Sequence, residues 1–541
     1  MTSLLKTLLF TISILAVAFG TSCRKEEVKP LKRVGGAGAL VNPYSASLRK
    51  LTNYEYRTSI KEILGLDVSQ DELPADTALN GFNSIGAARI ALNSDVLSSY
   101  KNLALRLATE ASSASRRQIF FSCTPSSSAD SACIDRIIEE SALKLWRRAP
   151  SALEKQRYQN MIIQLFASSG VSSDATSSLR GLLYAMLQSP NFLYRSEIGS
   201  AYAGGRAFDS FEIASRLAYL IWGGPPDSVL LQAAKDGQLN SPESILMQAQ
   251  RMIAQTKFQN GLHNYFRDYL ELDQLNKLAR DNSSEFEQLK PHFKTETLFT
   301  ISNLIVNDHG DYRDLLTYNK TYINGALARH YGFSKQGDQF EIFSIPTEMQ
   351  NQRQGILTQA SFLSHFAHPI DTSPTKRGLF IRQKFLCQSI GAPPDNAPTF
   401  VPAASEQART MRQRVELISE QASCAGCHRR MDPLGFAFEN FAADGKYRQQ
   451  DNQIPVDASG SVDDVNYTQL DEFFGLLRQH ERFAECAVLN FFRYANGRLE
   501  TPAEGPVIKA LADKFAEKNY NFQELIFEYV ASPLFLNRPP F

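Results

Sequence analysis

"LTNYEYRTSIKEILGLD" (Leu51–Asp67) predicts a helix whose two ends are both marked in the sequence. Thr52 and Glu55 form a capping box, in which each side chain bonds a backbone N–H at the helix start. Apolar residues follow at helical spacing, and Gly65 ends the helix because glycine readily takes the left-handed conformation used there. Similar signals recur along the chain, so this stretch decides the fold class: mainly α.

Two later stretches repeat this pattern, and a third departs from it. Within residues 209–227, an amphipathic helix is capped by Asp209 or Ser210 and stopped by the Gly-Gly-Pro-Pro run at 223–226. Residues 241–255 predict another, with Ser241 as its cap and Pro242 at the first helical position. Strand signals are few, and the clearest predicts a small β-hairpin within residues 446–460. We therefore expect a multi-domain helical protein with a small hairpin late in the chain.

The composition is that of a globular protein. The chain has 541 residues, of which 43 % are hydrophobic and 21 % are charged. At about 100–200 residues per domain, that length suggests three to five domains. The formal net charge is zero, so no basic excess indicates a nucleic-acid partner, and we expect none.

Residues 1–23 have the features of a secretory signal. Lys6 precedes an apolar run, Thr7–Gly20, that is too short to span a bilayer but suits a signal peptide. Cys23 follows small residues, as in a lipobox, where the cysteine is lipidated. Arg24 after that cysteine suggests an outer-membrane lipoprotein that faces the periplasm or the cell surface and is tethered only through its lipid. The alternatives are a plain signal peptide cut nearby or a short anchor.

Export changes the interpretation of the cysteines, because extracytoplasmic compartments oxidise thiols. Of seven cysteines, one is assigned to lipidation and two form a closely spaced pair, which leaves an even number. Cys123 and Cys133 lie ten residues apart across a serine-rich loop and are natural disulfide partners. Cys387 and Cys486 would form the second disulfide. The alternative is that these four are buried free thiols.

The closely spaced pair lies in "SCAGCHRRMDPLGF" (Ser423–Phe436). A chain of this composition would contain a CxxCH pattern by chance roughly once in a thousand cases. The pattern is the signature of c-type haem attachment. Cys424 and Cys427 would bind the two vinyl groups of one covalent haem c, and His428 would be the proximal iron ligand. We expect one haem per chain.

Three other interpretations of the pair stay open. A zinc site needs four ligands, and no second CxxC or His pair follows at the usual spacing. A thioredoxin-like site has a strand before its helix, whereas an amphipathic helix is predicted before Cys424. A structural disulfide between Cys424 and Cys427 also suits an exported protein.

The sixth iron ligand is less well marked. Met431 lies only three residues past the proximal histidine, and Met411 fits the core face of its own helix. His368 is the favoured distal candidate and His365 the second, because the two lie at helical spacing before a proline. If neither reaches the iron, the site is open and suits ligand or peroxide chemistry.

An internal repeat divides the chain. Residues 145–195 and 491–538 share an aromatic-Arg start, an acidic helix and an apolar helix that ends in Ser-Pro, followed by Phe-Leu-x-Arg. We expect two copies of one helical unit. The predicted segments are a signal peptide (1–23), a tether (24–45), an N-terminal helical domain (46–112), repeat copy 1 (120–197), a central helical domain (205–318), a haem-motif domain (319–464) and repeat copy 2 (465–541).

Several segments resemble a known family. "LQSPNFLYRSE", "ASRLAYLIWGGPPD", "TSPTKRGLFIRQKFLC" and "CAGCHRRMDPLGFAFENFAADGKYR" occur in the same order in exported bacterial proteins of the planctomycete type, which have five successive domains of unknown function. The resemblance covers residues 48–538. It implies that the CxxCH motif attaches haem, and that a histidine matching His368 occurs in some members. The role of the family is not settled, so the resemblance implies no substrate.

These observations lead to one expected function and two alternatives. We expect a lipid-anchored c-type cytochrome-like protein that exchanges electrons with an unknown redox partner or cell-envelope component. The first alternative is a haem enzyme, such as a peroxidase or oxygenase, with an open distal site. The second is a structural or binding lipoprotein whose CxxC pair is a disulfide and which holds no haem.

Overall fold

The computed structural model describes residues 48–89, 93–168, 175–202, 205–280, 284–391 and 401–538. Cys23 and the predicted signal and tether segments lie outside these residues. The described residues fall within one compact unit, Pro43–Phe541. None of the helices in these ranges is both long enough and apolar enough to cross a bilayer.

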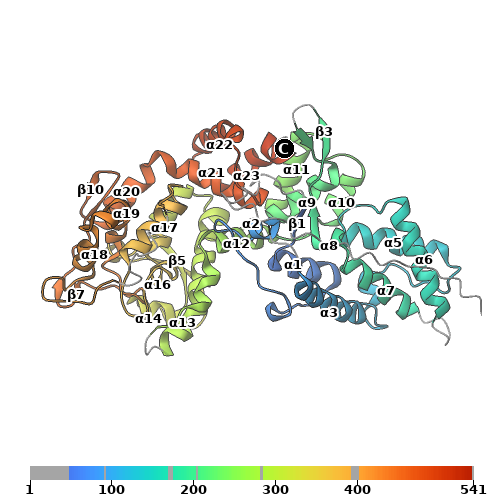
Figure 1. The fold of residues 1–541 in the computed structure, drawn as a ribbon, viewed down its shortest axis with the longest axis horizontal. Coiled ribbons are helices and arrows are strands. Elements are labelled where there is room, and N and C mark those ends of the chain that lie inside the picture. Colours follow the sequence, from blue (N-terminus) through green and yellow to red (C-terminus); the bar gives the residue numbers. More distant parts are fainter. Residues whose placement is uncertain are drawn as a thin grey trace, which may run out of the picture. The chain divides into compact units, whose positions relative to one another are not determined.

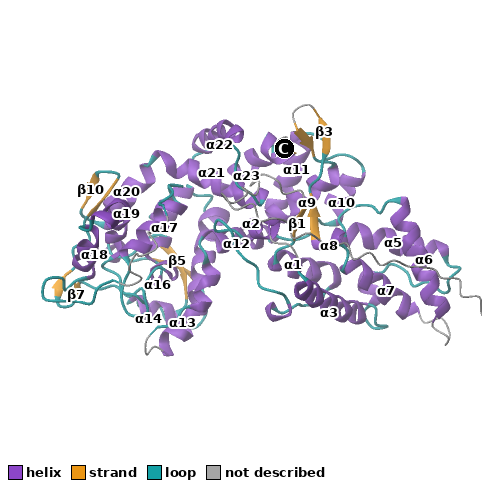
Figure 2. Cartoon of the chain, viewed as in Figure 1, coloured by secondary structure: helices purple, strands orange, loops and turns teal. Residues whose placement is uncertain are grey.

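Helices dominate the described residues, which confirms the mainly-α prediction (Figure 2). The strands are two to four residues long, and within the described ranges they form four two-stranded sheets and one three-stranded sheet. The predicted hairpin is present: β7 (Gln450–Asp451) pairs antiparallel with β8 (Ile454–Pro455). Asn452 and Gln453 in its turn both have positive φ, as a type I′ turn requires.

The first part of the described chain has its own core. Helix α1 is capped by Thr52 and Glu55 and ends at Gly65 with φ 63°, as predicted. Apolar residues of seven helices of this part, among them Tyr56, Leu107 and Leu183, form one buried cluster, which also includes Tyr219. The elements are β1 (Leu48–Lys50), α1 (Asn53–Leu64), η1 (Gln70–Glu72), α2 (Asn83–Arg89), α3 (Ser94–Ala111), α4 (Arg117–Phe120), α5 (Ser131–Leu145), α6 (Ala152–Ser168), α7 (Ala175–Leu187), α8 (Pro190–Leu193) and β2 (Tyr194–Ser196).

The remaining elements share a second, larger core that runs from Phe82 to Phe535 in the sequence. Its central part contains β3 (Ser200–Tyr202), β4 (Gly205–Ala207), α9 (Ser210–Ile221), α10 (Ser228–Lys235), α11 (Pro242–Ile253), α12 (Lys257–Tyr269), η2 (Leu272–Lys277), α13 (Ser284–Ser302), η3 (Asn303–Asn307), η4 (Tyr312–Leu316), β5 (Lys320–Ile323), α14 (Gly325–Tyr331) and β6 (Glu341–Ser344).

The haem-motif region and the C-terminal repeat contribute to the same core. The first consists of α15 (Thr347–Gln350), η5 (Ile356–Thr358), α16 (Ala360–His365), α17 (Pro374–Lys384), α18 (Met411–Ser419), α19 (Ala422–Gly435), η6 (Phe436–Phe438), β7, β8, β9 (Gly460–Val462) and β10 (Val465–Tyr467). The second consists of α20 (Leu470–Gln479), α21 (Glu481–Asn496), η7 (Pro502–Glu504), α22 (Gly505–Glu517), α23 (Phe522–Val530), α24 (Pro533–Leu536) and β11 (Asn537–Arg538).

The two repeat segments have matching local structures. Both run through a long helix, two further helices, a short Ser-Pro helix and a strand, as α5 to β2 and as α21 to β11. Arg148 donates two hydrogen bonds to Glu154, at 2.8 and 3.0 Å, and Arg498 donates two to Glu504, at 2.6 and 2.9 Å. In each segment the residue before that arginine has a φ near 60°. The domain boundaries and the duplication stay predictions.

A buried group of charged residues ties the first repeat to the central helices. Arg195 forms ion pairs with Glu55 at 3.1 Å and with Glu197 at 2.9 Å, and its side chain is only 2 % exposed. Arg216 of α9 pairs with the same Glu197 and donates a hydrogen bond to Asn496 at the end of α21. The C-terminal strand β11 pairs with β4, which lies between Glu197 and Arg216 in the sequence and pairs in turn with β3, labelled near the C-terminus in Figure 1.

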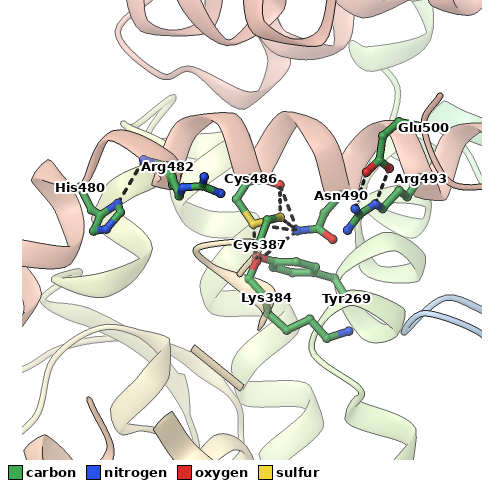
Figure 3. Close-up of a disulfide and its surroundings, with 9 residues drawn as sticks. All are labelled: Tyr269, Lys384, Cys387, His480, Arg482, Cys486, Asn490, Arg493 and Glu500. Atoms are coloured by element: carbon green, nitrogen blue, oxygen red, sulfur yellow. Dashed lines mark hydrogen bonds and ion pairs between the residues drawn. A yellow bond between two sulfur atoms is a disulfide. The ribbon is translucent and has the colours of Figure 1, made fainter. Parts of the chain in front are cut away.

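The structure contains both predicted disulfides. Cys123 is bonded to Cys133, and Cys387 is bonded to Cys486. Figure 3 shows the second, which joins the end of α17 to α21. The Asn490 Nδ2 lies 3.3 Å from one sulfur and 3.2 Å from the other. This disulfide therefore fixes the segment directly after α17 to α21.

Candidate functional site

The CxxCH motif lies in the first half of helix α19. Cys424 and Cys427 are three residues apart on this helix, so their side chains lie on the same side, about one turn apart. Both are free thiols and both are partly exposed. A Cβ added at Gly426, between them, would meet no atom within 4 Å. Because both thiols are partly exposed, a group that attaches covalently can reach them.

His428 is held by an aspartate one turn further along α19. Its Nδ1 lies 2.8 Å from the Asp432 Oδ2, and this hydrogen bond, opposed in part by burial, raises the pKa of His428. The carboxylate accepts a hydrogen bond from the Nδ1–H group, which fixes the tautomer and leaves the Nε2 lone pair for a metal. Metal-ligating histidines typically donate such a hydrogen bond from the ring nitrogen that does not bind the metal.

Asp432 is in turn held by two neighbouring helices. It is only 3 % exposed and accepts a hydrogen bond from the Thr375 hydroxyl of α17 at 2.7 Å. The Ser419 hydroxyl, at the end of α18, lies 3.4 Å from its other oxygen. The orientation of His428 thus depends on three helices rather than on α19 alone.

Two glycines bring α17 and α19 into backbone contact. A Cβ at Gly378 would lie 1.8 Å from the Met431 carbonyl oxygen, and one at Gly435 would lie 1.9 Å from the Pro374 carbonyl oxygen. Neither distance leaves room for any side chain. The close approach places Thr375 within hydrogen-bonding distance of Asp432, so these glycines position the site.

A buried arginine fastens the other side of α17. Arg377 is fully buried and donates hydrogen bonds to the carbonyl oxygens of Phe438 at 2.8 Å and Leu363 at 3.1 Å. It also lies 3.6 Å from Glu439, and burial lowers its pKa to about 10. Arg377 therefore links α16, α17 and the turn after α19.

The two candidate distal histidines lie before α17 and have different surroundings. His368 donates its backbone N–H to the Asp371 carbonyl oxygen at 2.8 Å, and burial lowers the pKa of its imidazole. The His365 Nε2 lies 3.7 Å from the Glu271 Oε2, at the start of η2. In the described ranges no hydrogen bond or ring contact joins either imidazole to His428, so an iron ligand from this segment stays a prediction.

Both methionines near the motif are core residues. Met411 is 2 % exposed and packs with Val415 and Phe436, and Met431 is 6 % exposed. The described residues also contain no group of three or more His, Cys, Asp or Glu side chains placed to hold a metal ion. The geometry therefore offers no closed zinc site at the motif, and the thiol pair with its histidine remains the only functional group there that the described chain shows.

Five family models match the chain, and each is described as a protein of unknown function. They follow one another as DUF1587 (49–113), DUF1595 (133–197), DUF1592 (208–333), DUF1588 (353–451) and DUF1585 (463–535). The chain belongs to this five-domain family. Its CxxCH helix lies within the DUF1588 match. No curated protein and no solved structure matches the chain.

Sequence reasoning about this five-domain protein missed Asp432 and Thr375. Asp432 follows His428 by four residues within one helix, and side chains at this spacing are neighbours, so the sequence alone was enough to predict their contact. Thr375 lies 53 residues before His428, and only the packing of α17 on α19 brings it near. No local pattern marks it.

Proposed function

We propose that this protein is a lipid-anchored, extracytoplasmic c-type cytochrome-like protein with one covalent haem, which transfers electrons to or from a separate partner. One observation carries the proposal. Two free, partly exposed thiols lie about one helical turn apart, and the next residue is a histidine whose Nδ1 is already hydrogen-bonded to a buried carboxylate.

Each residue of the site has a distinct role in this proposal. Cys424 and Cys427 attach the porphyrin through thioether bonds, and His428 binds the iron through Nε2. Asp432 positions the imidazole and increases its basicity, and Thr375 positions Asp432. When bound, the haem supplies a one-electron iron couple.

One structural feature and one sequence feature support a location outside the cytoplasm. Disulfides are rare in reducing compartments, and the described residues contain two. The lipobox-like sequence at Cys23 supports attachment to the outer membrane through lipid. The proposed partner is a redox protein or another component of the cell envelope, and the neutral net charge gives no reason to expect a nucleic acid.

One observation favours a second candidate, a haem enzyme with an open distal position. The His365 Nε2 lies 3.7 Å from the Glu271 Oε2, so this candidate distal ligand already has a carboxylate beside it. An iron with one protein ligand would keep a position for peroxide or oxygen. The spin state of the iron distinguishes the two candidates.

The test is expression of the full chain together with a haem-attachment system. The proposal predicts a haem-staining band on a denaturing gel and a mass increase of one haem, both lost in Cys424→Ala/Cys427→Ala and kept in Gly426→Ala. A low-spin spectrum supports electron transfer, and a high-spin spectrum supports the enzyme. Matured protein whose mass shows no haem contradicts both. Replacement of His368 by Ala is expected to convert low-spin to high-spin if this residue is the distal ligand.

A further inference from the structure

A cavity lies away from the CxxCH motif, between the first helix and the central helices. Its volume is about 700 Å³, within the range of small-molecule sites. The start of α1, the loop that follows η1, and the stretch from α12 through η2 to α13 form its walls. These segments belong to the first and third matched domains, and pockets at such junctions are frequent ligand sites.

Several charged groups in the walls already have hydrogen-bond or ion-pair partners within the protein. Asp268 accepts two hydrogen bonds from Asn83, at 3.0 and 2.9 Å, and burial raises its pKa to about 6. Asp273 forms ion pairs with Lys294 and Arg267. The walls are thus held in place without a ligand, and neither sign of charge dominates them.

Other polar groups in the walls have no partner. Gln274, Asn276 and Lys277 of η2 line the cavity together with Asp71, and their side chains make no hydrogen bond or ion pair with another described residue. The Asn53 Oδ1 is buried in the wall and also has no partner among the described residues. Gln274 is half-buried, and Asn276, Lys277 and Asp71 are exposed, so these donors and acceptors lie where a ligand that enters from solvent can reach them.

Strained backbone also lies at this cavity. Glu271 has a φ of 56°, which is unfavourable for a residue with a side chain. Its carboxylate lies 3.0 Å from the Lys384 Nζ and 3.7 Å from the His365 Nε2. Strain of this kind is concentrated at ligand sites. The same ion pair connects the cavity wall to α17, the helix that supports the haem motif.

We propose that this cavity binds a neutral polyhydroxylated ligand, a short carbohydrate, through the polar side chains of η2. A hydroxyl group both donates and accepts, so it satisfies amides, an ammonium and a carboxylate alike. The side chains in the wall are mostly polar or charged, and Tyr54, Leu73 and two alanines are the exceptions with apolar surface, which disfavours an apolar ligand. Its balanced charge disfavours a ligand with many charges of one sign.

The experiment measures binding to the full matured chain by calorimetry or saturation-transfer NMR. The probes are neutral oligosaccharides of two to four units built from glucose, mannose, galactose or N-acetylglucosamine. At least one is expected to bind, and Gln274→Ala/Asn276→Ala is expected to weaken it at least about tenfold, since two hydrogen bonds are lost. Gln479→Ala/Asn240→Ala, an exposed pair of the same residue types elsewhere, is expected to leave the affinity unchanged.

Three results would overturn the inference. In the first, none of the sugars binds at about 10 mM; in the second, the η2 variant binds the sugar as the control variant does. In the third, inorganic phosphate or spermidine binds instead, and the η2 substitutions weaken that binding. The proposal is independent of the haem. Cys424→Ala/Cys427→Ala is therefore expected to bind the sugar as the unaltered chain does, so a failure of one proposal is distinguishable from a failure of the other.

Discussion

The His428 Nδ1 lies 2.8 Å from the Asp432 Oδ2, one turn away on α19, and the carboxylate is buried under α17. A histidine in this setting presents a single nitrogen outward. The helix thus supplies an oriented ligand as well as two thiols. This relationship separates the motif from a chance CxxCH on an exposed loop, where nothing would hold the imidazole.

Replacement of Asp432 by Ala is expected to disorder the histidine without removing the anchors. Loss of such an outer partner typically costs about 10–100-fold in metal affinity or activity. The haem stain should persist, because the thiols are intact, while the midpoint potential should rise as the imidazole loses basicity. Potentiometry and the low-spin absorbance measure this. A variant with the potential of the parent would show that Asp432 is only structural.

Replacement of Gly378 by Ala is expected to force α17 and α19 apart, because the new Cβ would lie 1.8 Å from the Met431 carbonyl oxygen. Overpacking of this kind costs at least about 1–3 kcal/mol. The matched control is Gly426→Ala, which meets no atom within 4 Å. Thermal unfolding should separate the two variants clearly. Equal unfolding temperatures would argue against the close helix contact.

The two disulfides are expected to differ in their effect on stability. In the chain-entropy model a loop of 99 residues between Cys387 and Cys486 gives about 4–5 kcal/mol, and the ten-residue loop between Cys123 and Cys133 gives about 2–3 kcal/mol. Denaturant titration of each double Cys→Ala variant measures the difference. Equal losses would indicate that loop length does not determine the stabilisation.

Replacement of Arg195 by Ala is expected to destabilise the fold by up to about 3–5 kcal/mol, because the buried Glu55 and Glu197 would each lose one of two cationic partners. The control is Lys509→Ala, which breaks an ion pair with Asp513 whose side chains are 69 % and 63 % exposed. That variant should unfold with the parent, since exposed pairs contribute little. If Arg195→Ala unfolded with the same free energy as the parent, the two carboxylates would have to be solvated by water in the variant.

Glu296 is expected to make stability fall as pH rises. It is fully buried, and burial raises its pKa from 4.5 to about 7, although Tyr331 and Thr321 donate hydrogen bonds to it. The folded state therefore binds the proton more tightly than the unfolded state. The stabilisation is complete below about pH 4.5 and is lost as pH rises through 7, on the order of 3 kcal/mol in all.

Replacement of Glu296 by Gln should remove that pH dependence and stabilise the protein at pH 8. Glu287→Gln, on the same helix but with a side chain 53 % exposed, should leave the dependence unchanged. Chemical unfolding at pH 5, 6, 7 and 8 measures both variants. A parent protein whose stability is level across this range would contradict the buried, protonated state.

Local signals were enough to predict the helices and their ends. The capping box of α1, its terminal Gly65 and the Ser241 cap of α11 are all present, because each depends only on residues within a few positions. Both disulfides also followed from counting cysteines in an exported chain. The turn of β9 and β10 was not predicted. Asp463 and Asp464 have positive φ in this turn. Because neither residue is glycine, the sequence gives no strong indication of that conformation.

The candidate site was only partly predictable. The thiols and His428 are contiguous in sequence, so pattern alone identified them. The environment that orients them was not, since Thr375 and Gly378 act through backbone contact between helices that are far apart in the chain. The η2 cavity had no motif at all, because its walls come together only in the folded protein.

The last strand has a consequence for how the protein is made. Strand β11 ends at Arg538 and completes a sheet with β4, more than 300 positions earlier, while Phe535 lies in the larger core. A ribosome must therefore release almost the whole polypeptide before that core can close. The first core, by contrast, uses no described residue beyond Tyr219, so it can form while the rest of the chain is still being synthesised.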